Sequence, residues 1–149
     1  MVRGAACVAL ALSCAACGSD GRPARRATPM PDSLRFEVIA PAEARRGNAV
    51  SITLRLTNVG AHPVEAHFLG REIAFDVVVR DEQNAVVWRR LEGRAVPSIL
   101  QIRMLEPGET MEWKEAWRPA RSGRYRLQGV LPSDAPEPLL TPNVEVSVR

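Results

Sequence analysis

Two histidines are the residues of this chain best suited to hold a metal or to transfer a proton. His62 and His67 lie five positions apart around Pro63. Because side chains alternate along a strand, an odd separation directs the two imidazoles to opposite faces, away from a shared ion. The sequence therefore predicts neither a metal site nor a cofactor at these histidines.

A serine hydrolase would need a serine, a histidine and a carboxylate brought together. Ser98 and Ser122 are the candidate nucleophiles, but neither stands in a Gly-x-Ser-x-Gly turn. The adjacent carboxylates Asp81 and Glu82 lie in a polar run, where a solvated turn is the simpler interpretation. The sequence has no glycine-rich phosphate loop either. We therefore expect that the protein is not an enzyme.

All three cysteines, Cys7, Cys14 and Cys17, lie in the first seventeen residues. The rest of the chain therefore has no means of forming a disulfide, a zinc–thiolate site or a thiol nucleophile. The chemistry of the cysteines belongs to the N-terminal segment.

Residues 1–16 are typical of a signal peptide, with Arg3 followed by an apolar run too short to span a bilayer. The end of this segment resembles a bacterial lipoprotein cleavage site, in which small residues precede a cysteine that becomes acylated and N-terminal. Cys17 fits this pattern best. Cys14 remains an alternative, because neither cysteine has the leucine that such sites prefer three positions upstream. An ordinary cleaved signal peptide is the other interpretation. A lipid anchor would place the protein in the cell envelope, facing the periplasm or the exterior.

Residues 17–32 connect this cysteine to the rest of the chain. They are small, polar and proline-rich, a composition that buries no core and is typical of a tether. Arg22, Arg25 and Arg26 could contact anionic lipid headgroups, although a solvated linker is the simpler interpretation.

The charge of the chain argues against a nucleic-acid partner. Of 20 basic and 17 acidic side chains, Arg3 leaves with the signal peptide, so the remainder is nearly balanced. Basic residues alternate with acidic ones instead of forming the clustered patch that nucleic-acid binding needs.

Residues 33–149 show the alternation of short β-strands, with about ten residues from one strand to the next. The hairpin from Phe75 to Trp88 has two valine-rich runs around a polar turn, and we place it at the centre of the core. The pattern predicts one domain, an all-β, immunoglobulin-like antiparallel β-sandwich of about eight or nine strands. The expected strands lie near residues 34–38, 50–56, 64–68, 75–79, 86–88, 98–104, 111–117, 124–131 and 144–148.

Three apolar residues near residue 100 conflict with a simple alternation, and we expect Leu100, Ile102 and Met104 to face the core. Glu115 interrupts an otherwise apolar strand face, which predicts either a position at the sheet margin or a bulge. Pro107 and Gly108 have the order that a type II turn needs.

The larger aromatic residues each allow two interpretations. Trp88, Trp113 and Trp117 are expected to fill the interior of the sandwich, the alternative being an exposed binding surface. Tyr125 is either a tyrosine corner, whose hydroxyl bonds back to the main chain, or an ordinary half-buried aromatic residue.

The order of several short segments resembles the intracellular proteinase inhibitor family, the BsuPI domain. The similar segments are Leu56-Thr57-Asn58, Phe75-Asp76-Val77, Val87-Trp88-Arg89, the run from Leu105 to Thr110, Trp113 with Trp117, and Gly123-Arg124-Tyr125. The resemblance covers roughly residues 50–131 and implies an immunoglobulin-like fold and inhibition of a subtilisin-like serine protease. The founding member is cytoplasmic, whereas this chain has an export signal.

The residues that carry the resemblance have the character of structural framework, and no reactive-site motif can be transferred with them. The framework consists of Phe75, Val77, Trp88, Pro107, Gly108, Trp113, Trp117, Gly123 and Tyr125.

A loop between two expected strands is the candidate for contact with a protease. It contains apolar residues that strand periodicity does not require, and the other interpretation is that Val96 and Ile99 plug one end of the sandwich. Its residues are Gly93, Arg94, Ala95, Val96, Pro97, Ser98 and Ile99.

Two other functions remain open from the sequence. The module could be a non-inhibitory structural adaptor lipoprotein of the cell envelope that binds another protein. A carbohydrate- or ligand-binding sandwich would need tryptophan or tyrosine on an exposed face. Edge strands could also pair two copies of the chain.

Overall fold

The computed structural model describes residues 32–149, which contain eleven β-strands and no helix. No helix that could cross a membrane therefore occurs in this part of the chain. The signal peptide, the acylated Cys17 or Cys14 and nearly all of the tether lie outside the described residues and stay predictions. The strands are β1 (Leu34–Ile39), β2 (Glu43–Ala44), β3 (Val50–Asn58), β4 (Val64–Leu69), β5 (Asp76–Arg80), β6 (Val86–Arg89), β7 (Leu100–Leu105), β8 (Thr110–Trp117), β9 (Gly123–Leu131), β10 (Leu139–Leu140) and β11 (Val144–Val148).

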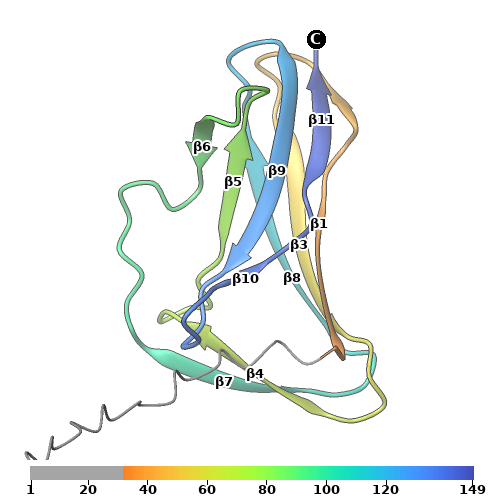
Figure 1. The fold of residues 1–149 in the computed structure, drawn as a ribbon, viewed down its shortest axis with the longest axis vertical. Helices are drawn as coiled ribbons and strands as arrows, with labels where there is room; N and C mark the ends of the chain where they lie inside the picture. Colours follow the sequence, from red (N-terminus) through yellow and green to blue (C-terminus); the bar gives the residue numbers. More distant parts are fainter. Residues whose placement is uncertain (1–31) are drawn as a thin grey trace, which may run out of the picture.

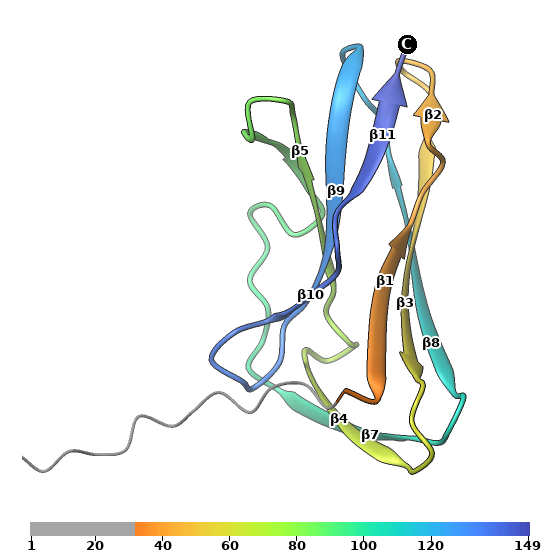
Figure 2. The same cartoon turned by 45° about the vertical axis from the view of Figure 1, so that its right-hand side comes forward.

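Two sheets pack face to face as a β-sandwich (Figures 1 and 2). One has the order β1-β3-β8, and the other has the order β2-β11-β9-β5-β6, with β10 added beside β9. Every pairing is antiparallel except that of β2 with β11. The expected all-β, immunoglobulin-like sandwich is confirmed, as are the nine expected strands. The two-residue strands β2 and β10 are too short to leave a periodic pattern.

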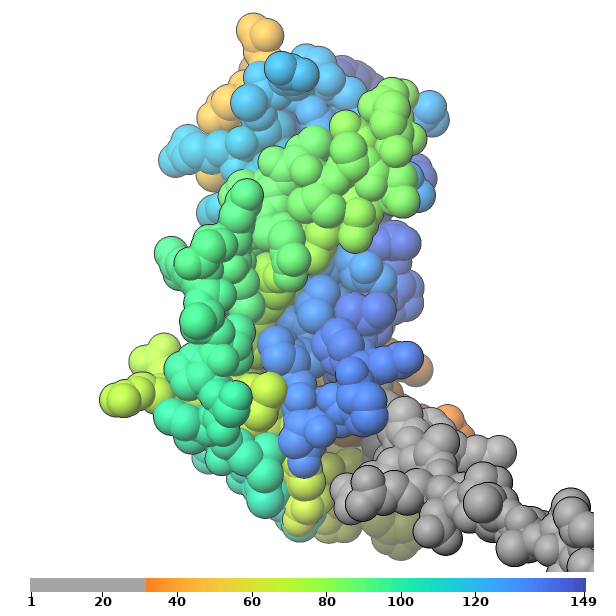
Figure 3. Space-filling model, turned by 60° about the vertical axis from the view of Figure 1, so that its left-hand side comes forward, coloured from red at the N-terminus to blue at the C-terminus, as the bar shows by residue number. Residues whose placement is uncertain are grey.

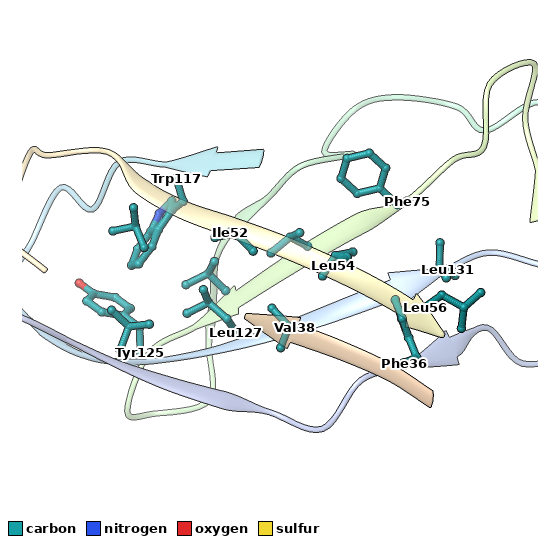
Figure 4. Packing of buried hydrophobic residues seen from close by; sticks show 14 of the residues in the cluster. Phe36, Val38, Ile52, Leu54, Leu56, Phe75, Trp117, Tyr125, Leu127 and Leu131 are labelled. Atoms are coloured by element: carbon teal, nitrogen blue, oxygen red, sulfur yellow. The ribbon is translucent and has the colours of Figure 1, made fainter. Parts of the chain in front are cut away.

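The central strands β3 and β9 each contribute more buried residues to the core cluster than any other strand (Figure 4). Val50, Ile52, Leu54 and Leu56 of β3 are each at most 1% exposed and alternate with residues that face the solvent. Gly129 of β9 lies opposite, where an added Cβ would come within 2.5 Å of Leu54 Cδ2. The absence of a side chain at Gly129 is therefore what lets the two sheets approach closely at this point.

The expected hairpin exists, but it is not the centre of the core. Val77 and Val79 of β5 are fully buried, and Phe75 just before the strand faces the same interior, as the sequence predicts. β6 is an edge strand, and Val86 and Val87 are each 46% exposed. The prediction that the hairpin lies at the centre of the core is wrong, because a run of valines indicates a strand but not whether another strand pairs with its outer edge.

Of the three tryptophans expected in the interior, only Trp117 is buried. It stands edge-on to Tyr125, with ring centroids 4.9 Å apart (Figure 4). Trp113 and Trp88 are both half-buried against the core, and Trp113 packs on Phe68 and Phe75.

Two local predictions about turns are confirmed. The Tyr125 hydroxyl donates to the Arg121 carbonyl at 2.8 Å, which makes it a tyrosine corner. Gly108 has a φ of +79°, and the Glu109 N–H donates to the Glu106 carbonyl at 2.9 Å, as a type II turn requires.

Glu115 lies at the sheet margin, and β8 pairs with β3 without a bulge. Its carboxylate accepts from Arg90 Nε at 2.9 Å. The same guanidinium stacks over the Phe75 ring at 3.7 Å and donates to the Phe75 carbonyl.

β4 and β7 form a separate two-stranded ribbon across one end of the sandwich (Figures 1 and 2). β4 follows β3 after a break at residues 59–63, and β7 precedes β8 with a break at residues 106–109. Ala66, Phe68 and Leu105 point inward and are buried. The ribbon therefore acts as the end wall of the core.

The prediction that Leu100, Ile102 and Met104 face the core is wrong. These side chains are 44%, 54% and 54% exposed, respectively. Leu105 is buried, and side chains alternate, so Leu100, Ile102 and Met104 share the outer face of β7. A two-stranded ribbon at the end of a sandwich has only one face on the core, and its register assigns that face to Leu105.

Asn58 makes the break between the two strand pairs possible. It is fully buried, and its amide group donates to the carbonyls of His62 and Leu105, both at 2.8 Å. Its carbonyl oxygen Oδ1 accepts from the Gly60 N–H at 2.9 Å, and its backbone carbonyl accepts from the Gly108 N–H. One side chain thus satisfies backbone groups that the interrupted ladder leaves without partners.

Asn58→Asp should therefore destabilise the domain by about 2–4 kcal/mol, because the carboxylate keeps the bond from Gly60 and loses both donated bonds. Thr57→Val is the matched control, since Thr57 is solvent-facing and bonds only to the Thr110 hydroxyl. The control should change the free energy of unfolding by less than about 0.5 kcal/mol. Urea unfolding measures both, and equal values would contradict this role of Asn58.

Candidate functional site

The candidate loop lies on the flank of the sandwich, between β6 and β7 (Figure 1). Residues 94–99 have no regular secondary structure. Val96 is half-buried, and the other residues from Gly93 to Ile99 are exposed. Ile99, at 44% exposure, does not plug the end of the sandwich. The loop is therefore accessible along most of its length.

A buried carboxylate fixes the first end of the loop. Asp76 is 1% exposed, and its Oδ2 accepts from Arg89 Nε at 3.0 Å and from Arg89 Nη2 at 2.6 Å. Its other oxygen, Oδ1, accepts from the Leu91 N–H at 3.0 Å. The Arg94 N–H then donates to the Leu91 carbonyl in a turn that contains Gly93, whose φ is +69°. The departure of the chain from β6 is thus tied to a core strand.

The other end of the loop is fixed by Gly70 and Gln101. The Gly70 N–H donates to the Ile99 carbonyl at 2.9 Å. The Gln101 amide donates to the Gly70 carbonyl at 2.7 Å and to the Arg71 carbonyl at 2.6 Å. Gly70 has a φ of +113°, and an added Cβ would come within 2.3 Å of the Glu72 carbonyl oxygen, so only glycine fits there.

A groove of about 700 Å³ lies beside the first half of the loop. Figure 3 shows this flank, with the loop in green to blue-green beside the blue C-terminal strands. Val96 is half-buried against it, and Arg89, Glu92 and Arg94 bring charge to it. The groove is lined by Asp76, Val86, Val87, Arg89, Leu91, Glu92, Gly93, Arg94, Val96, Val130, Pro132 and Pro138.

The histidines do not come together with this loop or with each other. Both ring nitrogens of His67 are hydrogen-bonded, Nε2 to Glu65 Oε1 at 2.7 Å and Nδ1 to Asp134 Oδ2 at 2.9 Å. These bonds raise the pKa of His67, that with Glu65 most and that with Asp134 next. Within residues 32–149, no three side chains of the metal-binding types gather as a candidate metal site.

Sequence reasoning missed the two anchors of the loop. Asp76 carried a usable signal, because a carboxylate between Phe75 and Val77 in a buried strand requires a partner. Gln101 and Gly70 carried none, since their contacts join residues about thirty positions apart. The loop itself was recognised from its lack of strand periodicity.

Residues 38–136 match the family described as BsuPI, intracellular proteinase inhibitor. The chain belongs to the BsuPI family. The matched range begins inside β1 and ends in the loop after β9, so it contains the candidate loop, both of its anchors and the whole lining of the groove except Pro138. The family is one of inhibitors, which agrees with a non-catalytic BsuPI module acting on a protease.

Solved structures resemble this BsuPI domain only distantly. The CARDB domain of the PF1109 protein from Pyrococcus furiosus, in complex with di-metal ions, is 16% identical, with a TM-score of 0.45 over 78% of this chain and 87% of that one. A β-glucosidase from Erythrobacter marinus is 15% identical, with a TM-score of 0.44 over 78% of this chain and 15% of that one. An alkylpurine DNA glycosylase from Pseudomonas fluorescens, bound to DNA with an abasic site analogue, is 11% identical, with a TM-score of 0.43 over 78% and 30% of the chains. No curated protein matches the chain.

The His67 bridge predicts a pH-dependent stability of this BsuPI domain. Because the pKa of His67 is raised above 6.5 in the folded state, its stabilising effect is full below that value and is lost as pH rises through the folded pKa. The stability difference between the wild type and His67→Gln should therefore shrink between about pH 6 and pH 8.

Urea unfolding across this pH range measures the difference. His62→Gln is the matched control, because His62 lies outside the bridge, and it should follow the wild type. If the stability difference between the wild type and His67→Gln stays constant with pH, the protonated imidazole of His67 does not stabilise the fold through Glu65 and Asp134.

Proposed function

We propose that this BsuPI module is exported, anchored to a membrane through Cys17, and inhibits a subtilisin-like serine protease with residues 93–99. The observation that carries the proposal is the candidate loop, which is exposed at every residue except the half-buried Val96 and is fixed at both ends. The family supports a protease as the partner in general. The sequence of residues 1–17 supports export and acylation.

A loop fixed at both ends suits inhibition for two physical reasons. Binding in a protease cleft requires an extended segment, and a loop already held by Asp76 and Gln101 loses less conformational entropy when it binds. If the enzyme cuts the loop, the same bonds keep both new ends in place, so the cut product leaves slowly and re-forms the peptide bond readily. A flexible loop would instead behave as a substrate.

The anchors give the inhibition test its variants. Gln101→Ala removes the bonds to the Gly70 and Arg71 carbonyls and should weaken inhibition roughly 10- to 100-fold, the equivalent of two neutral hydrogen bonds. The same variant should be cleaved faster between residues 93 and 99. Inhibition constants against a panel of serine proteases, with mass spectrometry of the loop, measure both effects.

Thr57→Val on the far sheet is the control and should inhibit as the wild type does. A wild-type protein that is folded, uncleaved and without effect on any protease would contradict the inhibitory function. It would favour the adaptor lipoprotein instead, and the next measurement would be a search for its membrane partner.

Acylation can be tested separately from inhibition. We expect the mature chain in a lipoprotein-processing bacterium to begin at Cys17 with a diacylglyceryl mass. Cys17→Ser should abolish that mass and release the protein from the membrane fraction, whereas Cys14→Ser should leave both unchanged. The opposite pattern would identify Cys14 as the anchor, and an unmodified chain in both would mean an ordinary signal peptide.

A further inference from the structure

The outer face of β7 is an exposed apolar strip at the end of the sandwich. Leu100, Ile102 and Met104 are 44%, 54% and 54% exposed and project side by side from one strand. Leu69 of β4 lies opposite Leu100 and is half-buried. Contiguous apolar surface of this kind indicates contact with something other than water.

This strip lies at the end where the described chain begins. The Val59 N–H donates to the Ser33 carbonyl, directly beside the Asn58 corner from which the β4–β7 ribbon departs. Figures 1 and 2 both show the start of β1 next to β4 and β7. Any anchor upstream of residue 32 is therefore attached at the apolar end, and the turn at residues 45–48 lies at the opposite end.

The length of the preceding chain keeps this end near the anchor. Fifteen residues, Gly18 to Asp32, separate Cys17 from the domain. Fully extended, they reach about 50 Å at most. The membrane surface therefore stays within reach of the strip at a high effective concentration, so even weak apolar contacts would be occupied.

We propose that the outer face of β7 rests in the interfacial layer of the bilayer to which Cys17 anchors the chain. The inference depends on the lipid anchor of the proposed function. Leu100, Ile102 and Met104 enter the headgroup boundary, as apolar side chains of interfacial proteins do. On the same outer face, Glu65 and His67 of β4 lie directly across from Met104 and Ile102 and give the strip a polar border, which stays among the headgroups.

The backbone of β7 limits the depth of this contact. The bond between Gly70 and Ile99 directs the N–H and C=O groups of residues 99, 101, 103 and 105 toward β4, so those of residues 100, 102 and 104 lie on a free edge. Free backbone groups need water or headgroup partners, which exist at the interface and not in the hydrocarbon core.

A second copy of the chain fits the strip less well. Three apolar side chains on a six-residue strand fall far short of the roughly 800 Å² per partner that stable interfaces bury. A lipid surface needs no complementary shape, and the anchor already supplies proximity. The contact would hold the candidate loop, which runs into β7, close above the bilayer, within reach of proteases at that membrane.

The test uses two single-cysteine-substitution variants of the full, anchored chain, each with a fluorophore at one end of the sandwich. Ile102→Cys carries the label on the strip, and Asn48→Cys carries it on the exposed turn at the opposite end. The parent chain, treated identically, gives the background from its own cysteines. The proteins are reconstituted in phosphatidylethanolamine–phosphatidylglycerol vesicles with a nitroxide-labelled lipid, and acylation is verified by mass.

The label at position 102 should show a blue-shifted emission and at least twofold greater quenching than the label at position 48. Adding Leu100→Ser and Met104→Ser should remove this difference without changing the melting temperature, because both side chains are already exposed. Equal quenching in acylated protein would overturn the inference alone. Quenching between labels that rises with protein density would assign the strip to a second copy and overturn it also. A chain without acyl groups would overturn the anchor and, with it, this inference.

Discussion

The buried side chain of Asn58 holds the corner at which the strand pair of β3 and β8 gives way to the ribbon of β4 and β7. An antiparallel ladder that ran on from β3 into β4 would continue past the sandwich and leave its end open. The break at residues 59–63 turns the ribbon across that end, and it exposes backbone groups that the buried amide of Asn58 then satisfies. The position of Phe68 over the core, the register of β7 and the second anchor of the loop all follow from this corner.

The sequence predicts what alternation and turn chemistry determine. The period-2 pattern of β3, the Pro107–Gly108 turn and the Tyr125 corner each depend on residues close together in the chain, and each is confirmed. Alternation says that a strand has two different faces without saying which face the rest of the protein covers. For β7, the choice depends on the distant pairing of Leu105 with Val64, which local sequence does not encode.

The candidate site also has one part that the sequence predicts and one part that it does not. The loop could be predicted because its residues fit no strand, whereas its fixation could not, because it comes from bonds between remote positions. Asp76 on β5 reaches Arg89 and Leu91, and Gln101 on β7 reaches Gly70 and Arg71. Strand β5 thus contributes Val77 and Val79 to the core on one face and the loop anchor on the other, which couples the shape of the loop to the stability of the whole domain.

The bonds that hold the candidate loop come from outside it or from its main chain. Among the described residues, no side chain from Gly93 to Ser98 donates or accepts a hydrogen bond. Mutations there can accumulate without loosening the scaffold, since Asp76, Gly70 and Gln101 keep the main chain in position. Under the proposed function, a lineage that carries this domain could therefore change its target protease through substitutions at a few exposed residues, while the sandwich that displays them stays the same.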